Sequence, residues 1–228
     1  IEAFLDWIGK YSRGTIQIRF YSLKKFLKFL GKLELIEGIT IAKVKDIKVK
    51  AGDLLTREEL ARLVDAAYTA RGRAFLMMLY ESGARIGEIL NIKLNDLDFD
   101  PEGVLVTIDG KTGRRRIRLV ESSDYLRRWA SVVRKENQTY LWFGPDGGPS
   151  KYPATVKFLR KVLKKAGLKK HVYPHLFRHS RASELAQKLK ESQLRAFMGW
   201  GAASDMPRVY IHLTAQDLDR AILDLYKT

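Results

Sequence analysis

The stretch that decides the fold class reads VLVTIDGKTGRRRIRLV, residues 104–120. Its two ends, 104–108 and 115–120, alternate in polarity or carry β-branched side chains, as half-buried strands do. Between them, Asp109 and Gly110 suit the positive φ that tight hairpin turns need. We therefore expect a small antiparallel β-hairpin within a chain whose other patterns are helical.

Amphipathic helices are predicted on both sides of this hairpin. Thr56 and Glu59 form the signature of a capping box in front of an apolar helical face. Ser82 and Gly83 end the strongly apolar helix that follows. The predicted helices cover residues 2–10, 14–31, a segment that begins after Thr56, 73–81, a short segment from Arg85, 123–135, 153–166, 174–188, 192–198 and 214–226. The expected fold class is therefore mainly α (α+β), with one small antiparallel sheet.

A basic stretch without a large apolar cluster separates two parts of the chain. It reads KVKDIKVKAG over residues 43–52 and is the best candidate for a linker. We expect a helical first domain with its linker at 1–52 and a second domain at 53–228. The chain begins at Ile1 inside a helical pattern, so we expect further residues to precede it in the natural protein.

The charge balance predicts an anionic partner. The 228 residues include 42 Lys and Arg but only 26 Asp and Glu, which gives a formal net charge of +16. A Lys-rich surface alone would normally add Glu as well, so the excess favours nucleic acid. Without Cys, the chain has neither disulfides nor thiolate metal ligands. No apolar run approaches about 18 residues, so we expect no membrane span. The expected location is the cytoplasm.

Two motifs place cationic side chains at helix starts. GARIGE at 83–88 puts Arg85 before a helix, with Glu88 three residues later. An arginine in that setting is more often a surface ion pair. YPHLFRHS at 173–180 puts His175 and Arg178 on one face of a helix whose entry a proline fixes. An imidazole and a guanidinium held side by side can clamp a phosphate.

The C-terminal motifs add an indole and a phenol. MGW at 198–200 carries Trp200, and RVYIH at 208–212 carries Tyr210, which follows a loop rich in small residues. Loops held by scaffold helices are common positions for reactive groups. The hairpin turn adds Lys111, on the segment GKTGRRR at 110–116.

In this order the motifs resemble those of the tyrosine recombinase (phage integrase) family, over about residues 53–226. The stretch from Gly199 to Leu213 is most similar to the archaeal, Xer-like branch, although the interval from Trp200 to Tyr210 is one residue longer than in common members. The first domain resembles only the second half of the family's helical core-binding domain. The resemblance implies the following site: catalytic Arg85, Lys111, His175, Arg178, Trp200 and Tyr210, with Glu88 supporting Arg85.

Elementary chemistry supports these roles. Attack on a DNA phosphorus builds negative charge on its non-bridging oxygens, which two guanidiniums and an indole N–H can stabilise. A phenol is a poor nucleophile at neutral pH, and His175 could take its proton or bind a phosphoryl oxygen. Lys111 on a hairpin could protonate the departing 5′ oxygen. The product would be a 3′-phosphotyrosine, which can be religated without metal, ATP or other cofactor.

Metal and nucleotide sites have weaker support. Asp96, Asp98 and Asp100 suggest a calcium loop, but Pro101 stands where its glycine is required. The four-residue spacing of His171, His175 and His179 suggests zinc, but a proline and an arginine interrupt them. No phosphate-binding glycine motif is present. We therefore expect no metal and no small-molecule substrate.

Basic groups flank the expected site and are predicted to follow a DNA backbone. They are Arg114, Arg115, Arg116, Arg118, Lys157, Arg160, Lys161, Lys164, Lys165, Lys169 and Lys170. The resemblance implies double-stranded DNA as partner, held by a tetramer. The predicted helix at 214–226 could then dock on a neighbouring subunit or pack in its own domain. A type IB topoisomerase-like nicking enzyme and a DNA-binding accessory protein remain alternatives.

Overall fold

In the computed structural model, the hairpin forms the two longer strands of a three-stranded antiparallel sheet. Its strands are β1 (Leu97–Asp100), β2 (Gly103–Gly110) and β3 (Gly113–Leu119), in the order β1-β2-β3. Val106 of β2 pairs with Leu97 on one side and with Ile117 on the other. All three side chains are buried, so one face of the sheet enters the core. The expected fold class, mainly α with a small antiparallel sheet, is confirmed.

The structure describes residues 1–41 and 51–214, and the chain divides into two units, Ile1–Lys48 and Val49–Thr228. The helix predicted over 214–226 therefore lies almost wholly outside the described residues. Each unit has its own core, and each is described separately.

The first unit is a small helical body. It contains α1 (Glu2–Gly9), α2 (Arg13–Phe29) and the 3-10 turn η1 (Leu33–Ile36). The Ser12 side chain caps α2 by accepting a hydrogen bond from the Thr15 N–H. Its core consists of four buried side chains: Ile8, Phe20, Leu27 and Ile36.

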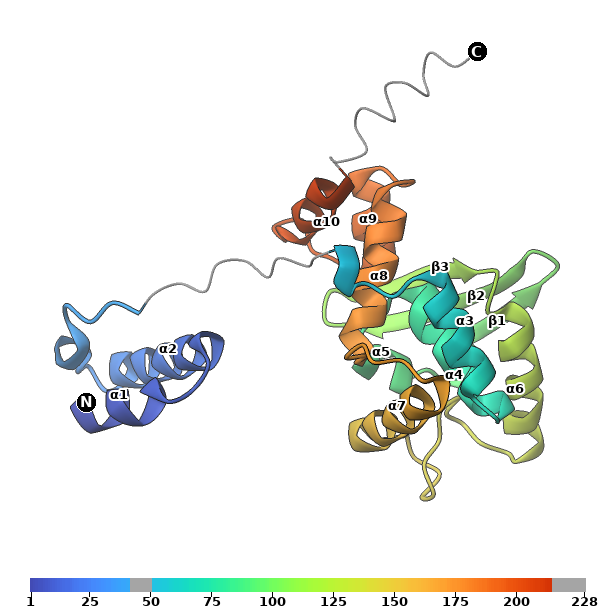
Figure 1. Cartoon of the computed structure of the whole chain (residues 1–228), viewed down its shortest axis with the longest axis horizontal. Helices are drawn as coiled ribbons and strands as arrows, with labels where there is room; N and C mark the ends of the chain where they lie inside the picture. The colour runs from blue at the N-terminus through green and yellow to red at the C-terminus, as the bar shows by residue number, and fades with distance from the viewer. Residues whose placement is uncertain (42–50, 215–228) are drawn as a thin grey trace, which may run out of the picture. The chain divides into compact units, whose positions relative to one another are not determined.

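The second unit is a helical layer packed on the sheet (Figure 1). Its helices are α3 (Arg57–Ala66), α4 (Ala70–Ser82), α5 (Ile86–Leu90), α6 (Ser123–Lys135), α7 (Tyr152–Ala166), α8 (Pro174–Ala186), α9 (Glu191–Met198) and α10 (Met206–Thr214), with 3-10 turns η2 (Ala51–Asp53) and η3 (Leu94–Asp96). The central helix α4 contacts α3, α6, α8 and β3, and its residues from Ala74 to Ser82 are all buried.

Local sequence signals account for several helix boundaries. The Thr56 hydroxyl accepts from the Glu59 N–H at 3.2 Å, and the Glu59 carboxylate accepts from the Thr56 N–H at 3.0 Å. This is the predicted capping box at the start of α3. Two elements differ from the prediction. Strand β1 occupies the acidic stretch considered as a calcium loop, and α10 begins at Met206, where we had expected a loop.

Candidate active site

The first half of the site is the turn between α4 and α5. Gly83 ends α4 with a φ of 54°, and Arg85 caps α5. The Glu88 carboxylate accepts from the Arg85 main-chain N–H at 3.0 Å and from its Nη1 at 2.9 Å. Glu88 thus holds the Arg85 side chain close to its own helix.

A second arginine binds the same carboxylate. Arg115 of β3 donates from Nη2 to Glu88 at 2.8 Å and from Nε to the Phe197 carbonyl at 3.0 Å. Burial alone would raise the pKa of Glu88, but the hydrogen bonds from Arg115 and Arg85 bring it below its ordinary value. The Arg115 side chain is only 10% exposed. Our prediction that Arg115 follows a DNA backbone is therefore wrong, because its guanidinium lies inside the protein.

The neighbouring arginines of β3 also have protein partners. Arg116 pairs with Asp98 at 3.1 Å, and Arg118 makes two 2.7 Å hydrogen bonds to Asp100. These pairs join β3 to the acidic strand β1 across β2.

Within the described residues, no group of three or more His, Cys, Asp or Glu side chains lies close enough to hold a metal ion.

Arg178 lies beneath this turn in the protein interior. Its Nη1 donates to the Gly83 carbonyl at 2.7 Å and its Nη2 to the Met198 carbonyl at 2.8 Å. The residue is 5% exposed. Burial, together with the nearby Arg85 charge, lowers the pKa of Arg178 to about 10. The two arginines are therefore close enough to repel one another.

The Gly199 carbonyl brings three elements together. It accepts from Arg85 Nη1 at 3.4 Å and from the Thr112 hydroxyl of the β2–β3 turn at 3.1 Å. Gly199 has a φ of 63°, and a Cβ there would lie 2.7 Å from Nη1 of Arg115. Lys111, next to Thr112, is exposed, and its ammonium makes no ion pair within the described part of the chain.

Trp200 and Tyr210 form the second half of the site. Their rings stack with centroids 5.5 Å apart and an interplanar angle of 10°. The Arg178 guanidinium carbon lies 5.6 Å from the centre of the Trp200 ring. Tyr210 is 1% exposed, and this burial raises the pKa of its phenol to about 12. The predicted nucleophile is therefore stored protonated in the interior, within electrostatic reach of Arg178.

The Tyr210 hydroxyl is hydrogen bonded to Nδ1 of His179 rather than to His175. His175 is exposed, one turn earlier on α8, and the two imidazole centroids lie 6.1 Å apart. Burial, followed by the Arg178 and Arg85 charges, lowers the pKa of His175. His175 therefore lies near both arginines, and its imidazole is accessible to a ligand.

Besides the burial of Arg115, two residues of this region were not predicted from the sequence to have a role here: His179 and Arg195. His179 had been considered only as a zinc ligand. Arg195 of α9 was not singled out, yet its Nη1 donates to the carbonyls of Gly201, Ala202 and Ser204. Its other nitrogens bind Glu191 at 2.7 and 2.9 Å. Arg195 thus fixes the path of the longer loop between Trp200 and Tyr210.

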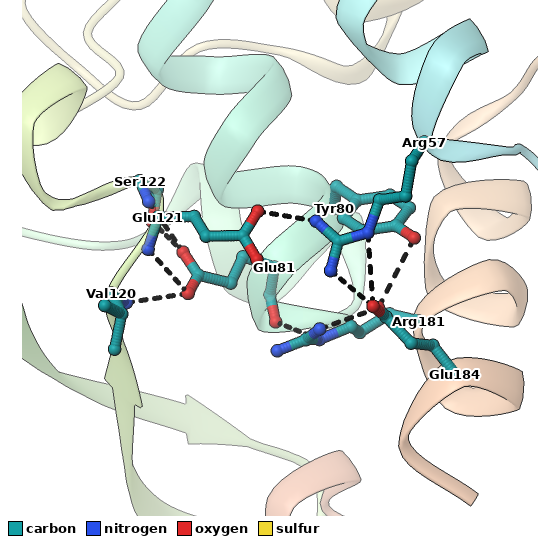
Figure 2. Close-up of polar contacts among 8 residues, drawn as sticks. All are labelled: Arg57, Tyr80, Glu81, Val120, Glu121, Ser122, Arg181 and Glu184. Carbon is teal, nitrogen blue, oxygen red and sulfur yellow. Dashed lines mark hydrogen bonds and ion pairs between the residues drawn. The ribbon is translucent and has the colours of Figure 1, made fainter. Parts of the chain in front are cut away.

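A buried carboxylate anchors the end of α4 that precedes Arg85. Figure 2 shows Glu81 accepting from the main-chain N–H groups of Val120, Glu121 and Ser122, at 2.6, 3.0 and 2.8 Å, and from the Ser122 hydroxyl. These donors form the turn into α6. Negative charge at a helix start is stabilised by such unpaired N–H groups.

A second carboxylate anchors α8, which carries His175 and Arg178. Glu184 accepts from Arg181 at 2.7 Å, from Arg57 of α3 and from the Tyr80 hydroxyl at 3.4 Å (Figure 2). Arg181 also donates to the Glu81 carbonyl at 3.0 Å. Both Arg178 and Arg181 therefore hold α8 to the C-terminal end of α4, which fixes Arg178 relative to Arg85.

The chain is similar in sequence to known proteins. Tyrosine recombinase XerC of Xanthomonas campestris is 33% identical over 177 residues, which are 74% of this chain and 54% of that protein. The chain thus spans about half the length of the XerC relatives it matches. Tyrosine recombinase XerA of Pyrococcus furiosus is 29% identical over 224 residues, 93% of this chain and 74% of that protein.

Solved structures share the fold. The XerH site-specific recombinase in a post-cleavage complex with its difH substrate gives a TM-score of 0.74 at 22% identity, covering 96% of this chain and 70% of that one. The crystal structure of XerA recombinase gives a TM-score of 0.66 at 22% identity, covering 100% and 82%. No helix of the described residues combines the length and apolar character needed to cross a membrane. The model of the phage integrase family matches residues 53–217, and the chain belongs to that family.

Proposed function

We propose that this chain is part of a site-specific DNA recombinase or integrase that cuts and rejoins strands through a 3′-phosphotyrosine. The stacking of Tyr210 on Trp200, next to the buried guanidinium of Arg178, is the observation that carries the proposal. The relatives support it, since they are named tyrosine recombinases. Structural neighbours bound to DNA include the XerH complexes and a lambda integrase tetramer on a Holliday junction.

In this proposal Arg85 and Arg178 bind the non-bridging oxygens of the scissile phosphate. Only two of the five guanidinium N–H groups of Arg178 are needed for its carbonyl contacts, so others remain for a ligand. The two guanidiniums of Arg85 and Arg178 repel one another. A bound transition state in which the phosphate resembles a dianion would relieve that repulsion. Glu88 keeps Arg85 in place.

The remaining groups have separate roles. The Trp200 indole N–H and His175 also bind phosphoryl oxygens, and Tyr210 attacks phosphorus. Lys111 protonates the departing 5′ oxygen. The hydrogen bond from Thr112 to Gly199 supports this role, because it joins the Lys111 turn to the carbonyl that Arg85 contacts. The charge of +16 fits a DNA partner.

The wider assembly follows from the same proposal. Residues 1–52 are part of a helical core-binding domain with its linker, and residues 53–228 are the catalytic domain. Four protomers hold two double-stranded DNA sites, and the protein acts in the cytoplasm on the nucleoid.

A covalent-adduct assay tests the proposal. The protein is incubated in EDTA with a nicked DNA substrate that traps the intermediate, and the products are separated on a denaturing gel. We expect an adduct with the wild type and none with Tyr210→Phe. Tyr68→Phe is the matched control, because Tyr68 is 69% exposed and should leave the adduct unchanged. An adduct in Tyr210→Phe would mean that another residue is the nucleophile.

A plasmid assay separates exchange from relaxation. Paired target sites on supercoiled DNA should give joined recombinant products. Relaxed circles without recombinants would favour a topoisomerase-like enzyme, and DNA binding without either product would favour an accessory protein.

A further inference from the structure

The Tyr210 phenol has one hydrogen-bond partner whose role the proposed function leaves open. That partner is Nδ1 of His179, on the helix that also carries His175 and Arg178. Tyr210 is 1% exposed, so water has little access to its hydroxyl in this arrangement. Any base that removes the phenolic proton from the stored position must therefore be a protein group.

The direction of this hydrogen bond follows from the chemistry of both groups. With its pKa raised to about 12, the Tyr210 phenol is protonated at neutral pH and can donate. Burial, followed by the His175 and Arg178 charges, lowers the pKa of His179, so its imidazole is neutral. Nδ1 then carries the lone pair that accepts the phenolic hydrogen, and Nε2 carries the ring proton.

We propose that His179 is the catalytic base that accepts the Tyr210 proton during strand cleavage. The inference rests on the proposed function, because it assumes that Tyr210 is the nucleophile. As the Tyr210 oxygen forms its bond to phosphorus, the two electrons of its O–H bond stay on the oxygen. The proton moves to Nδ1 of His179. The bond from phosphorus to the 5′ oxygen breaks, and that oxygen takes a proton from Lys111. In religation His179 returns its proton to Tyr210.

This assignment divides the work between the two histidines. His175 is exposed and lies near Arg85 and Arg178, as a ligand of a phosphoryl oxygen should. His179 is half-buried and already touches the atom that must lose a proton. A general base needs that contact first and a suitable pKa second. The groups facing His179 are Tyr210 of α10 and, on α8, His175 and Arg178.

Two substitutions separate a base from a docking contact. In His179→Asn, the amide oxygen stands close to the place of Nδ1 and can accept the hydrogen bond, but it cannot take the proton at neutral pH. His179→Ala removes both abilities. General base catalysis contributes about 100-fold or more, so we expect both variants to form the covalent adduct roughly 100-fold more slowly. His171→Asn is the control, because His171 is exposed and its ring lies against the Tyr173 ring, 5.3 Å between centroids.

The pH dependence of adduct formation provides a readout that a structural role would not change. In the wild type the rate should rise as the pH increases through the pKa of His179, which burial holds below its ordinary value, and then level off. His179→Asn should lose that step. Binding of the same DNA should remain within about twofold of wild type, since His179 does not contact it in this proposal.

The outcomes distinguish the two proposals. If wild type forms no adduct, the proposed function fails and the inference with it. If wild type forms the adduct and His179→Asn forms it equally fast, only the role of His179 as base is overturned. Faster cleavage by His179→Ala would also overturn it, because His179 would then restrain Tyr210. If His179→Ala does not fold, the adduct rate of His179→Asn and its pH profile still test whether His179 is the base.

Discussion

The two halves of the candidate site are held by different means. Arg85, Arg115 and Arg178 are fixed by charge-assisted hydrogen bonds to Glu88 and to main-chain carbonyls. They lie beside the main core, which extends from Leu55 to Phe177. Tyr210 belongs to a separate, smaller cluster of six buried residues: Ala182, Leu185, Leu194, Met198, Trp200 and Tyr210.

This difference matches what each half must do. Three neighbouring guanidiniums repel one another, so they need a buried anion and rigid acceptors to keep their positions before a substrate arrives. A nucleophile must instead approach phosphorus and later leave it. A small cluster opens at lower free-energy cost than a large core. We infer that the cationic half is preformed and that the half carrying Tyr210 moves.

The largest expected effect comes from breaking the cationic half at its anion. Glu88→Ala leaves Arg115 buried without its carboxylate and leaves Arg85 without its clamp. Removing one partner of a buried ion pair costs about 3–5 kcal/mol, and we expect that loss in the free energy of unfolding measured with urea. Glu102→Ala is the control, because that side chain is 80% exposed and its nearest ion pair is 3.9 Å long.

Equal stabilities of the two variants would contradict this picture. They would mean that Glu88 is no more important than a surface carboxylate, and that the arginines keep their positions by backbone contacts alone.

A smaller effect is expected where the two halves meet, at Gly199. An added Cβ would lie 2.7 Å from Nη1 of Arg115, and the φ of 63° disfavours side chains. We expect Gly199→Ala to lower the free energy of unfolding by roughly 1–3 kcal/mol. Gly201→Ala, two residues later, meets no atom within 4 Å and should change stability little. A stable Gly199→Ala protein would show that Arg115 can move away.

Much of the fold could be predicted because its signals are local. The capping box of Thr56 and Glu59 spans four residues, and the alternating strands predicted the hairpin. The position of its turn was predicted wrongly, because Asp109 and Gly110 pair with β3 and the two turn residues are Lys111 and Thr112, followed by Gly113 with a φ of 102°. Strand β1 was missed because Asp98 and Asp100 suggest a loop. Its pairing with β2, and the ion pairs of those aspartates with Arg116 and Arg118, are formed only in the folded chain.

The site residues were predicted unevenly for the same reason. Short motifs identified Arg85, Arg178 and Tyr210, and the contacts between their segments now support that grouping. The partner of His179 is 31 residues away and that of Arg115 is 27 residues away, so neither contact can be read from spacing.

The next prediction tests whether the Tyr210 half opens by itself. Arg195→Met removes three hydrogen bonds to the loop carbonyls, all of which lie in the segment that leads to Tyr210. Each such bond contributes about 1 kcal/mol, so the loss of all three should make local opening roughly 100-fold more frequent. Amide hydrogen exchange should accelerate at Ser204 and Arg208, while exchange at α4 stays unchanged. Arg208→Met, an exposed position on α10, is the control.

If α4 and the loop lost protection together in Arg195→Met, the two halves would unfold as one unit. The cationic half and the Tyr210 half would then not differ in how readily they open.

The smallest expected effect on stability comes from the ionisation of two single tyrosines. Tyr80 belongs to the main core, and Tyr210 belongs to the smaller cluster. Burial raises the pKa of both Tyr80 and Tyr210 to about 12. A phenol with a raised pKa stabilises the fold fully below its unfolded pKa, near 10, and that contribution is lost as pH rises through about 12. Both phenols should therefore ionise late in an ultraviolet titration, and Tyr80→Phe and Tyr210→Phe should each remove one late step.

A rapid jump to high pH then distinguishes the two phenols by rate. Tyr80 lies in the network of Glu184 and Arg57, so it should ionise only as the whole second unit unfolds. Tyr210 should ionise earlier, through opening of its small cluster, and faster still in Arg195→Met. Simultaneous ionisation of both would mean that the nucleophile is held as firmly as the cations, and its approach to phosphorus would then require DNA to open the cluster.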